Sequence, residues 1–125
     1  GIVIMVAKGN HGAILIDLLD SNEKLQAPNA IILLSSYVLT NNKLLDKDNN
    51  KFAKSLANSE PPVLDLYLKQ DNAIVIDKAP QRLALAKQEM KVYYRQRQLN
   101  NAMMGFYPEQ ELVVQINSWL KSIGW

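Results

Sequence analysis

The chain has 125 residues, a net charge of +2 and no cysteine, and 48% of its residues are hydrophobic. This length and composition are typical of one folded globular domain, and they exclude disulfides and thiolate metal sites. So small a net charge gives no strong reason to expect nucleic acid or an anionic membrane as a partner. Every apolar run is far shorter than the roughly 20 residues that cross a bilayer, so we expect no membrane span in this segment.

The first predicted element is a buried strand, because residues 2–6 (Ile-Val-Ile-Met-Val) are apolar without alternation. A turn of small residues follows over 7–12, and apolar residues recur at helical spacing over 13–19. An uncharged strand of this kind requires neighbours at its edges. We therefore expect residues 1–125 to form either a single α/β domain or the C-terminal part of a larger one. The partner of the first strand is then a missing N-terminal half or another chain, which includes a homo-oligomer.

The remaining elements alternate between strands and helices. In chain order they are a strand over 30–34, an exposed polar loop over 41–50, a short helix over 51–57, a strand over 63–67, a loop over 69–72, a helix over 80–90, a strand over 92–99 and a helix from Pro108. The strand over 92–99 is polar in its second half, which places it near the edge of the sheet. This order predicts a parallel sheet with right-handed crossovers and helices on its faces.

Four stretches carry a resemblance to a known fold. They are Val-Ala-Lys-Gly-Asn-His-Gly-Ala over 6–13, Ile-Ile-Leu-Leu-Ser-Ser-Tyr over 31–37, Pro-Val-Leu-Asp-Leu-Tyr over 62–67 and Tyr-Arg-Gln-Arg over 94–97. With them the chain resembles the C-terminal half of an α/β-hydrolase, and most of all a group of uncharacterised bacterial hydrolase-like proteins. The resemblance implies about four strands and four helices, and a bacterial protein that is periplasmic or exported.

Proteins of that fold carry their nucleophile on a sharp strand-to-helix turn with the pattern G-x-S-x-G. The resemblance places Ala7 at the first glycine of this pattern, Gly9 at the nucleophile and His11 at the second glycine. A shift of one residue places Asn10 at the nucleophile, and an amide is no better for acyl transfer. Either alignment indicates that the usual nucleophile is absent.

The other two triad positions are also poorly filled. The resemblance places the acid after the strand that ends near residue 67, where Asp71 is the candidate, and a histidine near residues 100–105, where none occurs. His11 is the one histidine of the chain, and it lies on the turn itself. We interpret Asp71 as a solvated turn residue and His11 as a structural or helix N-terminal residue. Ligand contact or weak acid–base work by His11, and a catalytic role for Asp71, are the competing interpretations.

The function predicted from these residues is binding or scaffolding by a hydrolase-like protein without a conventional serine triad. Whether the chain is an enzyme stays open, and the missing nucleophile and histidine argue against it. One alternative is an unconventional hydrolase completed by a missing N-terminal half. A second is a flavodoxin-like domain whose turn residues Gly9, Asn10, His11 and Gly12 bind a nucleotide or phosphate through backbone N–H groups. We expect no cofactor, and one histidine with scattered carboxylates gives no support for a metal site.

A cluster of cations lies towards the end of the chain. Arg95 and Arg97 lie on one side of their strand, and Lys91, Arg82 and Lys87 are close in sequence. We interpret this cluster as a solvated sheet edge. The aromatic residues nearby are interpreted as packing residues, because too few cations accompany them for base stacking; they are Tyr93, Tyr94, Phe106 and Tyr107.

Overall fold

A computed structural model describes residues 1–22, 24–39 and 45–125. The strands are β1 (Ile4–Lys8), β2 (Ala30–Leu34), β3 (Val63–Leu68) and β4 (Tyr94–Leu99), and the helices are α1 (Asn10–Ser21), α2 (Leu45–Ala57), α3 (Ala73–Gln88) and α4 (Glu109–Ser122). The strands form one parallel sheet in the order β1-β2-β3-β4. The α/β class, the parallel sheet and the strict alternation of strands and helices are as the sequence predicts.

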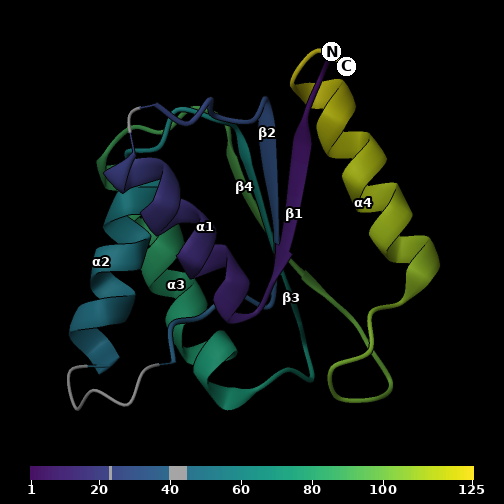
Figure 1. Ribbon diagram of the computed structural model, residues 1–125. Helices are drawn as coiled ribbons and strands as arrows, with labels where there is room; N and C mark the ends of the chain where they lie inside the picture. Colours follow the sequence, from purple (N-terminus) through teal and green to yellow (C-terminus); the bar gives the residue numbers. More distant parts are fainter. Residues whose placement is uncertain (23, 40–44) are drawn as a thin grey trace.

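The helices are divided unequally between the two faces of the sheet. α1, α2 and α3 cover one face and α4 covers the other (Figure 1). Each of the first three helices connects neighbouring parallel strands that advance in the same direction across the sheet, so crossovers of one hand place all three on the same side. All four strands end at the same edge, called here the carboxyl edge, and they begin at the opposite edge, called here the amino edge.

The two inner strands are buried on both faces and separate two apolar clusters. On the face of α1 and α2, residues of β2 and β3 pack with Ile16, Phe52 and Leu56. On the face of α4, residues of the same strands pack with Trp119. Leu112, Ile116, Leu120 and Ile123 are spaced to share one face of α4, and all four pack against this second cluster. β4 is an edge strand, as predicted.

β1 is also an edge strand, and it is not buried as the sequence predicted. Of its residues only Ala7 is buried, while Val6 is 59% exposed. β1 pairs with β2 along one side, and no other strand of the described residues pairs with its second side. An apolar strand can be buried only when a neighbour covers it, so the composition of β1 predicted a need for burial that this chain alone does not meet.

Two helices begin earlier than the sequence predicted. Residues 46–50 belong to α2 rather than to a loop, because Asp46 and Asp48 suit a helix N-terminus and the side chain of buried Asn49 hydrogen-bonds with the backbone N–H and C=O of Val38. The part of the predicted loop over 41–44 lies outside the described residues. α3 begins at Ala73, since Asn72 caps it by accepting a hydrogen bond from Ile74 N at 3.2 Å. Pro80 therefore lies inside α3 and not at its start.

Candidate functional site

The carboxyl edge of the sheet brings together residues from all four strand ends. Gly9 follows β1, Ser35 follows β2, Asp71 follows β3, and Tyr107 lies at the end of the segment that leads from β4 to α4. The carboxyl ends of parallel strands lie at the same edge of the sheet, and α/β proteins place their binding and catalytic groups at this edge. We therefore take this edge as the candidate site.

Gly9 makes the turn from β1 into α1 in a conformation that favours glycine. Its φ is 62° and its ψ is −132°, and its N–H donates to Leu34 O at 2.9 Å. Side chains rarely adopt this region, which is common at strained turns of functional sites. A Cβ on Gly12 would lie 2.8 Å from Ser36 Oγ and 2.9 Å from Leu33 Cδ2. Gly12 thus permits α1 to pack closely against the end of β2.

A buried hydrogen-bonded network joins the ends of the other three strands. Ser35 Oγ donates to Asp71 Oδ2 at 2.5 Å and lies 2.6 Å from the hydroxyl of Tyr107. Since each hydroxyl has one proton, Tyr107 donates to Ser35 when Ser35 donates to Asp71. Burial raises the pKa of Tyr107, so its hydroxyl stays protonated and able to donate. Ser35 itself has a φ of 52°, an unusual value for a residue with a side chain.

Asp71 is buried, so its interpretation as a solvated turn residue is wrong. Besides Ser35, its carboxylate accepts hydrogen bonds from Leu68 N at 3.0 Å and Asn72 N at 2.7 Å. These donors hold the carboxylate at the start of α3 and satisfy the charge that burial would otherwise destabilise. The sequence analysis identified Asp71 as a candidate but did not identify the other two members of the network. Ser35, the partner of Asp71, lies 36 residues before it, and Tyr107, the partner of Ser35, lies 72 residues after Ser35.

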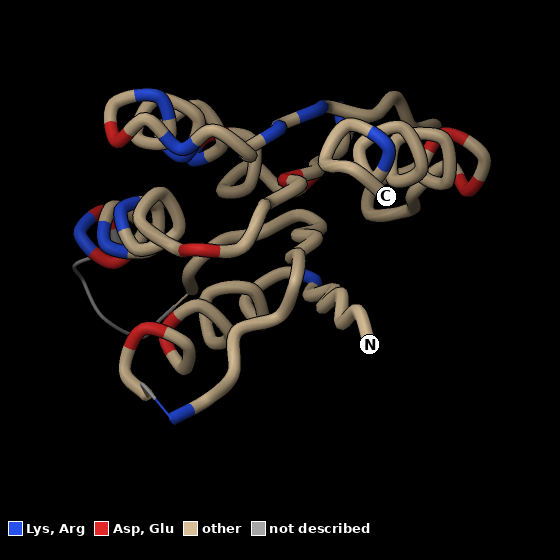
Figure 2. Tube along the Cα trace, turned by 90° about the horizontal axis from the view of Figure 1, so that it is seen from above, with Lys and Arg blue, Asp and Glu red and all other residues tan. Residues whose placement is uncertain are grey.

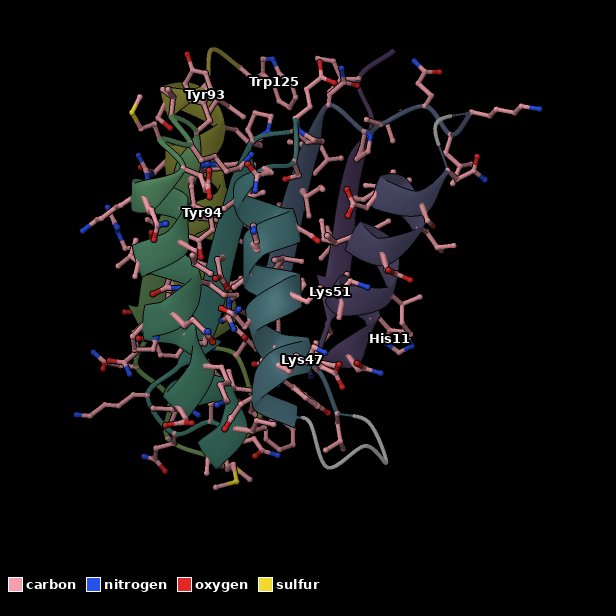
Figure 3. The ribbon with its side chains drawn as sticks, turned by 90° about the vertical axis from the view of Figure 1, so that its left-hand side faces the viewer. His11, Lys47, Lys51, Tyr93, Tyr94 and Trp125 are labelled. Atoms are coloured by element: carbon pink, nitrogen blue, oxygen red, sulfur yellow. The ribbon has the colours of Figure 1, made fainter. Side chains whose placement is uncertain are left out.

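His11 is not part of this network. It lies exposed in the first turn of α1, where its Nδ1 is 3.2 Å from Lys8 O. Asn10, the other turn residue with a polar side chain, lines a cavity of about 320 Å³ between α1 and α2, with Lys51 on the opposite helix. Figure 3 shows His11 and Lys51 on these neighbouring helices. The four turn residues named from the sequence therefore have different surroundings. Gly9 and Gly12 shape the turn and its packing, Asn10 lines the cavity, and His11 is exposed to solvent.

A second polar cluster, which the sequence analysis missed, is buried on the face of the sheet covered by α3. Arg82 of α3 donates to Asp65 of β3 through Nε at 2.7 Å and Nη2 at 3.2 Å. Tyr94 donates to the same carboxylate, and Gln96 Nε2 donates to it at 3.1 Å. Burial and the Asp65 carboxylate together raise the pKa of Tyr94. The available signal was one aspartate inside an otherwise apolar strand.

This second cluster corrects the predicted role of Arg82. Both Arg82 and Asp65 are almost entirely shielded from solvent, so Arg82 is not part of a surface cluster of cations. Its Nη1 also donates to Ser36 O at 3.0 Å, which ties α3 to the end of β2. The donors of Arg82, Tyr94 and Gln96 converge on the Asp65 carboxylate, and Gln96 Nε2 also donates to Ala79 O at 2.8 Å. The cluster therefore holds α3 against β3 and against the end of β2.

The described residues contain no group of three or more histidine, cysteine, aspartate or glutamate side chains that could hold a metal ion. Within the same part of the chain, no helix is both long and apolar enough to cross a membrane. The chain matches no family model and no curated protein.

Proposed function

We propose that the chain is the C-terminal half of an α/β-hydrolase-like domain that acts by binding or scaffolding at its carboxyl edge and does not catalyse acyl transfer. The observation that carries the proposal is Gly9. It has the backbone conformation of a sharp strand-to-helix turn, at the place where hydrolases of this fold hold their serine, but it has no side chain. The fold supports the resemblance, since strand, turn and helix follow in the required order.

The surrounding groups also favour binding over catalysis. A serine nucleophile needs a base within hydrogen-bond reach, and in hydrolases of this fold that base is a histidine held by an acid. Here Asp71 is engaged by Ser35, and Tyr107 approaches where the histidine is expected. A tyrosine with a raised pKa keeps its proton at neutral pH and is a poor general base. The network is suited to holding the three strand ends in fixed positions.

Ester hydrolysis tests this proposal. We expect the protein to release no p-nitrophenol from p-nitrophenyl acetate beyond the buffer rate, and the Gly9→Ser variant to remain inactive because no histidine is placed to activate the new hydroxyl. His11→Ala and Asp71→Asn serve as matched controls and should leave the background rate unchanged. Protein-dependent hydrolysis that disappears in both control variants would instead establish the unconventional hydrolase.

The exposed edge of β1 indicates where the rest of such a domain would attach, because a further strand could pair there and extend the sheet. Apolar side chains project from both faces of this strand, including Met5 and Val6, and the strand before Lys8 carries no charge that would discourage pairing. We propose that the occupant is a strand from the N-terminal half of the same fold or, in its absence, from another chain.

Sedimentation of the chain at increasing concentration tests the role of β1. We expect self-association, and we expect Val6→Lys to reduce it, because a charge on an edge strand opposes strand pairing. Val114→Lys is the matched control, since Val114 of α4 is exposed to a similar extent (62%) but lies on a helix. A chain that stays monomeric at all concentrations, or equal effects of the two lysines, would contradict this role.

A further inference from the structure

The turn between α3 and β4 displays apolar side chains to solvent. Met90 is 80% exposed and Val92 is 82% exposed, and Tyr93 beside them is also exposed. The turn lies at the amino edge of the sheet, opposite the candidate site, and Figure 3 shows Tyr93 and Trp125 at this same end of the molecule. Met90 has a φ of 57°, which is unfavourable for a residue with a side chain. Such strain persists only where the surrounding structure holds the residue in place.

The lysine of the turn points in the opposite direction. Lys91 folds its ammonium group inward, where Nζ donates to Ser59 O at 2.6 Å and Pro61 O at 2.9 Å. Burial lowers the pKa of Lys91, because removing the ammonium group from water destabilises its charged form. The backbone adds a hydrogen bond from Lys91 N to Ala86 O at 2.9 Å. A turn adapted to water alone would expose its lysine and bury its apolar residues.

The charges around the turn favour an anionic partner. Besides the inward Lys91, residues 87–97 contain three cations, Lys87, Arg95 and Arg97, and one carboxylate, that of Glu89, although the whole chain has a net charge of only +2. Arg95 and Arg97 lie on the face of β4 that also presents Leu99 to the α4 side of the sheet. Figure 2, which looks onto the amino edge, shows how the Lys and Arg segments are distributed over the molecule beside the Asp and Glu segments.

We propose that residues 87–97 form a docking site for an anionic phospholipid bilayer, with Met90 and Val92 entering the interface and the neighbouring cations contacting headgroup phosphates. Apolar tips flanked by Lys and Arg are the usual means by which proteins bind such surfaces without spanning them. A protruding turn needs no complementary pocket in a fluid partner, whereas a protein partner would have to supply one. A nucleic acid would satisfy the cations and leave the aliphatic tip in water.

Vesicle binding tests the proposal. We expect the chain to cosediment with phosphatidylcholine vesicles that contain phosphatidylglycerol, and to be released by high salt because exposed charges are screened. Binding should shift the tryptophan emission to the blue, and the shift should come from exposed Trp125, since Trp119 is already buried. The Met90→Asn/Val92→Ser variant should bind about tenfold more weakly, since two apolar side chains no longer enter the interface.

The control variant carries the same kind of change at the other edge of the sheet. Met103→Ser/Met104→Ser alters two residues that are 62% and 68% exposed at the carboxyl edge, and it should bind vesicles like the unchanged chain. The proposal is overturned if the chain does not sediment with anionic vesicles, or if both double variants lose binding equally. If vesicle binding is absent, two further measurements identify the partner. Loss of self-association in Met90→Asn/Val92→Ser would indicate a second copy of the chain, and loss of oligonucleotide binding would indicate a nucleic acid; either result overturns the proposal.

Discussion

Replacing Asp65 by asparagine is expected to lower the free energy of unfolding by about 3–5 kcal/mol. The change keeps the shape of the side chain but removes its charge. The guanidinium of Arg82, donating at 2.7 Å, would then be a buried cation without a counter-ion. Tyr94 and Gln96 would also lose their charged acceptor. Urea unfolding followed by circular dichroism measures the change.

A double-mutant cycle separates the ion pair from the rest of the cluster. Arg82→Met alone should also be strongly destabilising, because it leaves Asp65 charged and buried. The combined Asp65→Asn/Arg82→Met variant should be clearly less destabilised than the sum of the two single variants, since no uncompensated charge remains. Additive effects within about 0.5 kcal/mol would show that the two residues are not coupled as their contact requires.

Replacing Trp119 by alanine is expected to cost about 3–5 kcal/mol, because it leaves a large cavity beneath α4. Trp119 is 1% exposed and packs with Leu64, Leu66 and Leu99. α4 is the one helix of the described residues on its face of the sheet, so no neighbouring helix can close the space. Thermal unfolding should show a decrease in Tm of roughly 10 °C or more.

Trp125 provides the matched control for this substitution. It is the other tryptophan of the chain, and it is 41% exposed beyond the end of α4. Trp125→Ala should change stability by less than about 1 kcal/mol, as surface substitutions usually do. Equal losses for the two variants would show that α4 does not depend on burial of Trp119 for its place on the sheet.

The candidate site was predicted only in part. The turn at Gly9 follows from an apolar strand, small residues and a helical pattern that are adjacent in the sequence. The network of Ser35, Asp71 and Tyr107 depends on β2, β3 and β4 being neighbours with their ends at one edge. Asp71 was interpreted as solvated because a single aspartate after a strand says nothing about the donors that the fold brings to it.

The sequence by itself determined the alternation of strands and helices and the apolar face of α4, because both depend on spacing within one element. It also determined that the turn has a glycine, Gly9, at the position where the resemblance to α/β-hydrolases implies a nucleophile, and that His11 is the one histidine of the chain. The tertiary structure decided which polar residues are buried together and which apolar residues are left exposed. Arg82 turns inward to Asp65, Lys91 turns inward while Met90 turns outward, and β1 keeps a free edge. The physical reason is that burial is set by the neighbours a side chain meets in space, and those neighbours come from distant parts of the chain.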